Sequence, residues 1–512
     1  MKDATARGGA QEGREVELKL AIDPRRLDDV AEALARRAGK RARKDALHST
    51  YYDTPGQALR KAGVTLRVRR IGERRIQTVK AGEAQAGLFD RPEWEAEIEG
   101  DEPKLARAKG TALEPLLDGK AGKLRPVFRV EVERTAYQVK MGESRIEAAL
   151  DRGTISAGKR TASVSEVELE LKRGVPADLF ALARELAEEF PLRVGHSTKA
   201  ERGYRLREGK PDKPAKATPP KLRPGMTAGE AFQIIGRSCL RHLLANEPLL
   251  REARDPEAVH QMRVAMRRLR AAMSIFKRVV ADERSDTVRN ELRALAGELG
   301  EARDIDVLLE KTIAPARQRH PDEADLAALA VSYEERREAA YDKVIEGLES
   351  GRFARTVLDA AGWIETGPWL AQGTSAAARD EPAEAFAAKE LARRAKRIRK
   401  RGKHIEELEP EARHELRIAV KKLRYACEFF APLFPGAARI KRKKALRSAL
   451  GDLQDRLGDL NDVAVAAAMH GIGEHETAAR LLAQDLAGRS DEHLAGAIKA
   501  YREFAAAEPF WD

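Results

Sequence analysis

Carboxylates and an ammonium alternate with apolar residues in the segment Glu15-Val16-Glu17-Leu18-Lys19, near the start of the chain. Successive side chains on a β-strand point to opposite faces, so these three charged groups would share one face. Carboxylates grouped in this way suit a divalent metal, and the ammonium suits a phosphate oxygen. The same alternation returns in Thr65/Arg67/Arg69, Glu93/Glu95/Glu97, Arg129/Glu131/Glu133 and Glu166/Glu168/Glu170/Lys172.

These segments predict a sheet with one charged face and one apolar face. An antiparallel sheet with a solvated polar face is one interpretation. In the other, helices cover the apolar side, and the charged side lines the lumen of a closed barrel. Like charges in such a lumen repel one another unless a ligand of opposite sign intervenes. A polyphosphate bound by cations on some walls, and bridged by divalent metals to carboxylates on others, would neutralise both sets.

The length and composition predict two domains and a polyanionic partner. A chain of 512 residues exceeds the size of roughly 250–300 residues at which one core stops growing. The net charge of +12 favours an anionic partner, and the low aromatic content of 5% indicates a large helical portion. A proline- and lysine-rich stretch at 208–224 predicts an extended linker. We therefore expect an α+β domain at 11–207 and an all-α domain at 225–512.

The two cysteines and the hydropathy indicate a reduced, non-membrane environment. Cys239 and Cys427 each lie in a helical apolar pattern without metal or redox spacing, so both are predicted to be buried thiols. No apolar run reaches about 18 residues, so no membrane partner is expected. A cytoplasmic location follows as the expectation.

The charged strands carry a resemblance to a known family. Glu15-x-Glu17-x-Lys19 resembles the signature of the CYTH superfamily of triphosphate tunnel enzymes. Further motifs follow in the family's order over about residues 12–207. They include Tyr51-Tyr52-Asp53-Thr54, Leu66-Arg67-Val68-Arg69, Thr78-Val79-Lys80, Glu93-Trp94-Glu95, Leu150-Asp151-Arg152-Gly153 and Ser197-Thr198-Lys199-Ala200-Glu201.

This resemblance implies a closed tunnel of eight antiparallel strands with flanking helices, and metal-dependent hydrolysis of inorganic triphosphate with Mg²⁺ or Mn²⁺. Glu168 and Glu170, with Asp151 as an addition, would bind the metal that bridges the triphosphate. Glu15 and Glu17 would hold or polarise a second metal and its water, and with Lys19 they form the expected catalytic group. The residues expected to contact phosphate are Lys19, Arg67, Arg69, Lys80, Arg129, Arg134 and Lys199.

The second domain contains an internal repeat. The segment from His260 to Arg270 matches the segment from His414 to Arg424, and a Gly-containing motif at 300–307 matches 458–465. Two homologous halves, at about 225–370 and 371–512, follow from this. In each half the histidine and the cations after it share one helix face, which costs stability unless an outside group offsets the repulsion.

The repeated motif resembles the CHAD domain, a helical bundle of two symmetric halves whose family is associated with polyphosphate. The histidines have no metal-ligand spacing, and an imidazole near phosphate favours its cationic form. A third basic helix is predicted from about Leu391 to Ile405. The residues expected to bind polyphosphate are His260, Arg263, Arg267, Arg270, Arg393, Arg397, Lys400, His404, His414, Arg417, Lys421 and Arg424.

The sequence therefore predicts an inorganic triphosphatase, a phosphoric anhydride hydrolase, whose helical domain retains polyphosphate. One alternative is another CYTH activity, such as adenylate cyclase or hydrolysis of nucleoside or thiamine triphosphate. The other is a non-enzymatic scaffold for polyphosphate or another polyanion. Nucleic acid is not the expected partner, because the basic segments lack interleaved aromatic residues for base stacking.

Overall fold

The computed structural model describes residues 11–512 except 40, 83–87, 118–123, 372, 468–474 and 488–489. Two compact units form the chain. The first comprises the residues up to Lys213 together with Leu348–Thr366, and the second comprises Pro214–Gly347 and Gly367–Asp512. Among the described residues, no helix combines enough length and hydrophobicity to cross a membrane.

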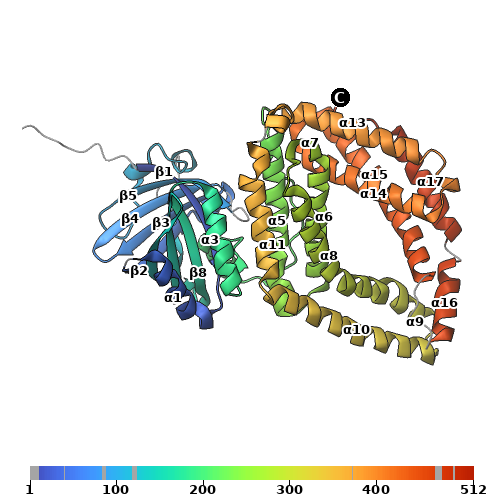
Figure 1. Cartoon of the computed structure of the whole chain (residues 1–512), viewed down its shortest axis with the longest axis horizontal. Coiled ribbons are helices and arrows are strands. Elements are labelled where there is room, and N and C mark those ends of the chain that lie inside the picture. Colours follow the sequence, from blue (N-terminus) through green and yellow to red (C-terminus); the bar gives the residue numbers. More distant parts are fainter. Residues whose placement is uncertain are drawn as a thin grey trace, which may run out of the picture. The chain divides into compact units, whose positions relative to one another are not determined.

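An antiparallel sheet dominates the first unit, drawn in blue to teal in Figure 1. Its strands follow the order β5-β4-β3-β2-β6-β7-β8-β1, and β5 also pairs with β1, so eight strands close into a barrel. The short β9 is added beside β1. The strands are β1 Gln11–Ala21, β2 Arg43–Asp53, β3 Val64–Ile71, β4 Arg74–Ala81, β5 Leu88–Glu97, β6 Arg125–Met141, β7 Ser144–Ala157, β8 Arg160–Arg173 and β9 Arg193–Val194.

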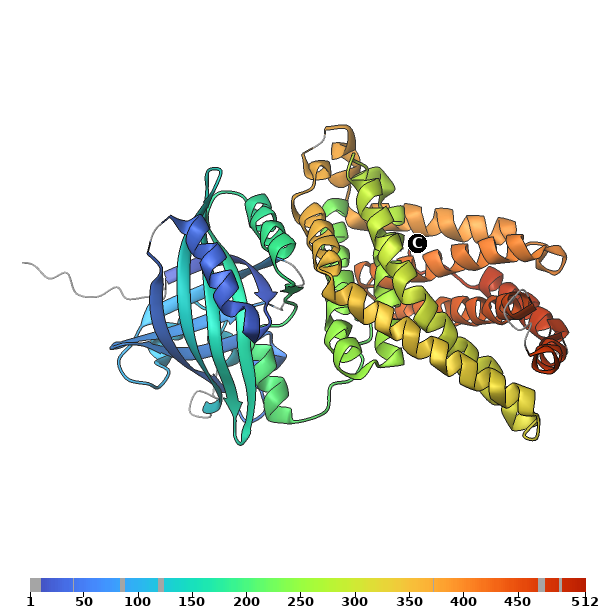
Figure 2. The same cartoon turned by 60° about the horizontal axis from the view of Figure 1, so that its bottom comes forward.

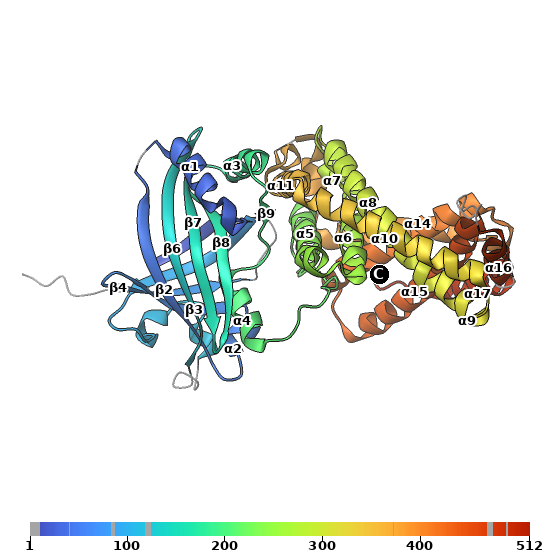
Figure 3. The same ribbon diagram turned by 90° about the horizontal axis from the view of Figure 1, so that it is seen from below.

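Helices cover the outside of this barrel and one of its ends. Helix α1 buries Leu27, Val30 and Leu34 on one face, as its apolar periodicity requires. Helix α11 packs on α3 (Figure 3), and a Cβ at Gly362 would lie 3.2 Å from the Phe180 ring. The helices of this unit are α1 Leu27–Ala38, α2 Ala58–Lys61, α3 Pro176–Glu189, α4 Lys199–Glu208 and α11 Arg352–Thr366.

The described residues of the second unit form helices and their connecting segments, together with one isolated bridge, Thr227 to Pro382. Its larger helices include pairs that lie side by side, such as the orange α13 and α14 in Figure 2. The helices are α5 Ala228–Ala253, α6 Pro256–Ile275, α7 Lys277–Val280, α8 Ser285–Leu308, α9 Ala314–Arg319, α10 Ala324–Glu349, α12 Ala376–Arg379, α13 Ala383–Arg401, α14 Pro410–Phe430, α15 Ala437–Ala467, α16 Glu476–Ala487 and α17 Ser490–Ala506.

Matching residues of the two repeat segments form the core of this unit. The rings of Phe232 and Phe276 lie 5.5 Å apart in the first half, and those of Phe386 and Phe430 lie 6.2 Å apart in the second. Phe276 also stacks on Phe386 at 4.7 Å, so the halves share one aromatic core. The predicted fold class, a closed eight-stranded tunnel followed by an all-α region, is confirmed.

The proline-rich stretch before α5 is extended, and part of it is attached to the helical unit. The amide of Asn246 donates to the carbonyl of Ala215 at 3.0 Å, and the Asn246 carbonyl oxygen accepts from the Ala215 N–H at 2.9 Å. Leu222 is buried. Cys239 and Cys427 are buried and unpaired, as predicted.

Candidate active site in the tunnel and basic surface of the helical unit

The charged side chains of β1 are buried inside the barrel. Glu15, Glu17 and Lys19 are 8%, 2% and 4% exposed. Their apolar neighbours Leu18 and Leu20 are fully buried on the opposite face of the strand. The alternation in the sequence thus produces a charged lumen, because both faces of the strand are covered.

Two cations neutralise Glu15. Lys80 Nζ lies 2.5 Å from Glu15 Oε1, and Arg91 Nε lies 3.1 Å from Oε2. Burial alone would raise the pKa of Glu15, but the charges of Lys80 and Arg91 outweigh it and hold this pKa well below its usual range. Arg91 also reaches Glu17 Oε1 at 3.0 Å, and Lys19 Nζ lies 3.0 Å from Glu17 Oε2. Glu15 is therefore anionic and saturated with donors.

Arg91 was not among the residues predicted from sequence. The strand pairing places it directly opposite Glu15. The signal was present in the sequence, because Arg91 precedes Glu93 and Glu95 at the same two-residue spacing. Glu93 lies 3.0 Å from Lys80, so this strand supplies both signs of charge to the lumen.

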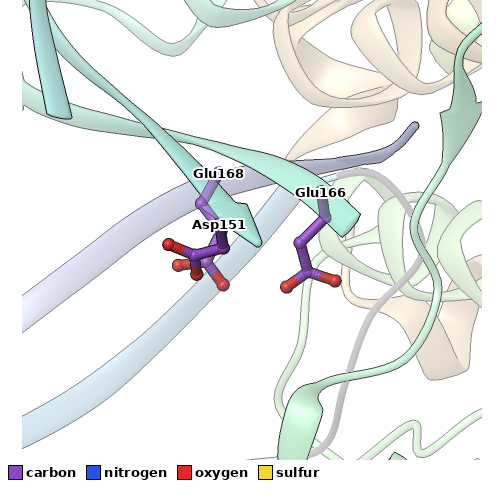
Figure 4. A group of neighbouring side chains, drawn as sticks. All are labelled: Asp151, Glu166 and Glu168. Carbon is purple, nitrogen blue, oxygen red and sulfur yellow. The ribbon is translucent and has the colours of Figure 1, made fainter. Parts of the chain in front are cut away.

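Three carboxylates from the neighbouring strands β7 and β8 converge beside β1 (Figure 4). Asp151 on β7 pairs in register with Glu166 on β8, and Glu168 follows two residues later. One oxygen of each lies within 4.8 Å of the others. We call Asp151, Glu166 and Glu168 the carboxylate triad. Asp151 and Glu168 are predicted metal ligands, whereas Glu166, which belongs to the same alternation, is not among the predicted ligands.

Lys199, the first residue of α4, contacts every member of the triad. Its Nζ lies 2.6 Å from Asp151 Oδ2, 2.5 Å from Glu166 Oε1 and 3.0 Å from Glu168 Oε1. Burial would lower the pKa of Lys199, but the three carboxylates raise it well above its usual range. Arg134 adds a bidentate pair to Asp151, with both distances 2.7 Å, and Lys19 bonds Glu168. The triad is thus neutralised by ammonium and guanidinium groups.

The triad's chemistry suits a hard divalent cation, because all of its donors are carboxylate oxygens. Glu170 lies apart from the triad. It pairs in register with Glu17 and with Glu147, and Lys172 Nζ lies 2.6 Å from its carboxylate. Burial, with added repulsion from Glu15 and Glu147, raises the pKa of Glu170. The structure therefore brings Asp151 and Glu168 together and places Glu170 with Glu17.

Arg67 and Arg69 on β3 complete the inner cations. Arg67 lies 3.8 Å from both Glu93 and Glu95. Arg69 donates from Nε to Ser49 Oγ at 3.1 Å, and no carboxylate of the described residues lies within 4 Å of it. Burial, together with repulsion from Arg67 and Arg134, lowers the pKa of Arg69 to about 10. Arg69 is thus a half-buried cation without a carboxylate partner among the described residues.

The predicted tunnel position of Arg129 is corrected by the structure. Arg134 faces the lumen, and β6 continues without irregularity from one residue to the other in its pairing with β7. Residues of opposite parity on a regular strand face opposite sides, so Arg129 lies on the outer face, where it is exposed. Glu131, on the same outer face, lies 3.6 Å from His48.

Apolar residues and helix α4 fill one end of the lumen. The inward positions of β6 before Arg134 are Phe128, Val130 and Val132, which pack with Ala200 and Tyr204 of α4. A Cβ at Gly203 would lie 2.3 Å from the Phe128 ring, so α4 approaches this wall closely. Figure 3 shows α4 at one end of the strands. The charged part of the tunnel is therefore confined to the remaining length of the barrel.

The repeated basic faces of the helical unit occupy matching environments. Arg263 Nη1 lies 2.7 Å from a Cβ built on Gly300, and Arg417 Nη2 lies 3.4 Å from one built on Gly458. The glycines therefore make room for the matching arginines. Burial and nearby cations, chiefly Arg303, lower the pKa of His260 to about 4, so its imidazole is neutral near pH 7. Asp462 lies outside the residues whose side chains are described.

Several of the predicted anion-binding arginines carry buried donors without acceptors. The Nε atoms of Arg267, Arg270 and Arg417 are buried, and within the described part of the chain they have no hydrogen-bond partner. Buried donors usually have partners, so these three atoms are available to an acceptor from outside the described residues. Helix α13 adds Arg393 and Arg397 to a cavity of about 1050 Å³, which Arg394 and Lys422 also line. Of the twelve residues predicted to bind polyphosphate, only Arg393 and Arg397 line this cavity. Arg394 and Lys422 were not predicted.

Comparisons with known proteins support both domains. Residues 13–204 match the CYTH domain family, and residues 234–470 match the CHAD domain family. The chain is similar to an inorganic triphosphatase of Haemophilus influenzae, with 35% identity over 195 residues, which are 38% of this chain and 55% of that protein. The match thus spans about half the length of this curated relative.

Two solved structures also resemble parts of the chain. The CHAD domain from the plant Ricinus communis is 28% identical, with a TM-score of 0.48, over 57% of this chain and 96% of that one. A Hippeastrum protein described as having a dominant triphosphatase activity is 19% identical, with a TM-score of 0.31, over 38% and 96%. From the two family matches, we conclude that the chain belongs to the proteins that combine a CYTH domain with a CHAD domain.

Proposed function

We propose that the tunnel hydrolyses the terminal phosphoanhydride bond of inorganic triphosphate with Mg²⁺ or Mn²⁺. The observation that carries this proposal is the closed lumen. Its wall carries buried cations and carboxylates, together with Arg69, which has no carboxylate within 4 Å among the described residues. A linear triphosphate matches such a lumen because each phosphoryl group presents several acceptor oxygens to fixed donors. The relative from Haemophilus influenzae, an inorganic triphosphatase, supports the choice of substrate class.

In this reaction water attacks the terminal phosphorus, the P–O bond to the bridging oxygen breaks, and orthophosphate and diphosphate leave. Lys80, Arg69 and Lys19 bind phosphate oxygens and offset the negative charge of the transition state. Glu170 is suited to accept the proton of the attacking water, because its pKa is raised towards the working pH. Glu15 instead orients Lys80 and Arg91, since it is saturated with donors.

The carboxylate triad would hold the divalent metal, which when bound supplies charge neutralisation to the phosphate chain. Its oxygens lie close enough together for this role. Lys199 contacts the same oxygens. A metal and the Lys199 ammonium therefore compete for the triad, and displacement of Lys199 would free this cation to contact phosphate.

The helical unit is proposed to bind polyphosphate. The buried arginine Nε atoms without acceptors and the basic cavity support an anion with many closely spaced oxygens. Linking such a unit to the tunnel raises the local concentration of phosphate chains near the active site.

The test of the hydrolysis is phosphate release from tripolyphosphate by the full chain, with ATP and thiamine triphosphate run in parallel. Release with Mg²⁺ or Mn²⁺, abolished by EDTA and by Glu170→Gln, is the expected result. A higher kcat/KM for ATP or thiamine triphosphate than for tripolyphosphate would overturn the substrate assignment. Competition between long-chain polyphosphate and duplex DNA at several salt concentrations tests the polyphosphate role, since each additional phosphate contact steepens the salt dependence.

A further inference from the structure

The helical unit breaks its internal symmetry at one pair of matching cations. Arg268 on α6 and Lys422 on α14 are 154 residues apart, the same spacing as that between His260 and His414. Helices α6 and α14 pack against each other, so each half presents its cation to the other. The two cations nevertheless have different surroundings.

Arg268 lies in a closed environment. It is 4% exposed, forms an ion pair with Glu428 on α14, and stacks over the Phe429 ring at 4.8 Å. The neighbouring positions Leu240 and Leu243 on α5 are buried and apolar. The charge of Arg268 is therefore compensated within the protein, and this place offers neither space nor free charge to a ligand.

Lys422 lies in an open environment. The residue that corresponds to Glu428 at the same spacing is Ser274, which supplies a hydroxyl in place of a carboxylate. Ser274 and Lys422 line the cavity of about 1050 Å³. Where α5 has Leu240 and Leu243, α13 has Arg394 and Arg397 at the corresponding positions.

The cavity carries a large excess of positive charge. Two carboxylates, Glu390 and Glu415, share its lining with eight cations. In the part of the chain that the structure describes, neither Arg397 nor Lys422 has a carboxylate within 4 Å. Burial, with smaller contributions from the adjacent Arg393 and Arg397, lowers the pKa of Arg394 to about 10, although Glu390, 3.4 Å from Arg394 Nε, opposes this shift. The eight cations are Lys277, Arg278, Lys389, Arg393, Arg394, Arg397, Arg401 and Lys422.

We propose that the helical unit has a single pocket for an oligophosphate chain, formed by Arg394, Arg397 and Lys422 beside Ser274, and that the Arg268–Glu428 pair closes the matching place in the other half. This inference rests on the proposed polyphosphate role and assigns it to one side of the symmetric unit. Ser274 decides which half binds, because a carboxylate at this position would neutralise Lys422 as Glu428 neutralises Arg268.

The experiment is lysine acetylation footprinting of the full chain, titrated with tripolyphosphate and read at each lysine by mass spectrometry. Burial and the nearby Arg394 and Arg397 lower the pKa of Lys422, which favours its acetylation. Tripolyphosphate is expected to protect Lys422 in the wild type and in Ser274→Gln. In Ser274→Glu the half-protecting concentration should rise at least tenfold, because the new carboxylate takes the place of a phosphate oxygen.

Equal protection of Lys422 in Ser274→Glu and Ser274→Gln would overturn the proposal. Should Ser274→Glu fail to fold, Arg397→Gln at an exposed position serves as the second variant. Its half-protecting concentration of tripolyphosphate should rise at least threefold, and no rise would refute the proposal. Lys80 reports the tunnel in the same spectra. Protection of Lys80 without protection of Lys422 refutes the pocket alone, whereas protected Lys422 in a chain that releases no phosphate supports the pocket and refutes the proposed hydrolysis.

Discussion

Replacing Lys199 by Met tests whether the carboxylate triad is a metal site held by an internal ammonium. The substitution keeps the length of the side chain and leaves the Thr198 cap of α4 unchanged. It removes three contacts of 2.5–3.0 Å between Nζ and carboxylate oxygens that are buried in the barrel. Removing one partner from a buried ion pair costs about 3–5 kcal/mol, because the remaining charge stays buried without compensation.

For a unit of this size, such a loss lowers the midpoint of thermal unfolding by roughly 6–20 °C. We expect this shift for Lys199→Met in EDTA. Mn²⁺ at 100 times its Kd should restore about 2.7 kcal/mol. Without competition from the ammonium, the affinity for Mn²⁺, measured by electron paramagnetic resonance without substrate, should rise at least about tenfold, which corresponds to ~1.4 kcal/mol.

The matched control is Lys343→Met, which removes an exposed lysine paired with Glu301 at 3.4 Å. Its effect on stability should stay within about 0.5 kcal/mol, and its Mn²⁺ affinity should equal that of the wild type. A Lys199→Met protein with wild-type stability in EDTA, or with unchanged Mn²⁺ affinity, would refute the assignment of the triad.

Three further predictions follow from the charges described above. Arg69→Met should raise KM for tripolyphosphate roughly 10- to 150-fold, which is equivalent to about 1.5–3 kcal/mol for a charged hydrogen bond. An unchanged KM in steady-state kinetics would contradict this prediction. Arg134→Met should lower kcat/KM for tripolyphosphate about 100-fold, whereas Arg129→Met, on the outer face, should keep a kcat/KM near that of the wild type. Similar losses in both variants would contradict the assignment of Arg134 to the inner face of β6 and of Arg129 to its outer face. Because the pKa of His260 is lowered to about 4 in the free protein, the helical unit should lose stability as the pH falls from about 6.5 to about 4. Denaturant unfolding of the full chain, followed between pH 7.5 and pH 4, detects this loss of stability. An equal loss in His260→Gln would exclude His260 as its source.

The strands and the charged lumen could be predicted from sequence because the two-residue period is a local property. Glu15, Glu17 and Lys19 point inward as that period requires. The family resemblance placed both Arg129 and Arg134 in the lumen, although five residues separate them, and a period of two does not reveal which face of β6 turns inward. Only the pairing with the neighbouring strands settles this, and the inward face of β6 is partly apolar because α4 packs there. The position of Arg91 opposite Glu15 likewise depends on the register between β1 and β5, which no local pattern encodes.

In the helical unit, the sequence repeat predicts two related halves with basic helix faces. It could not indicate where the halves differ in three dimensions, because the relevant comparison is between a residue of one half and its neighbour in the other. Ser274 and Glu428 have no special signal in the sequence, yet they decide whether a facing cation is compensated. The predicted domain limits also did not anticipate that α11 packs on α3.

The location of α11 has a consequence for how the protein can be divided. The backbone passes from one compact unit to the other after Lys213, again after Gly347 and once more after Thr366. Three covalent tethers therefore join the units, and no single proteolytic cut or stop codon can release either one intact. Isolating the tunnel would require α11 to be grafted back onto α3, for example by circular permutation, and a chain truncated in the proline-rich stretch would expose the apolar surface that this helix covers.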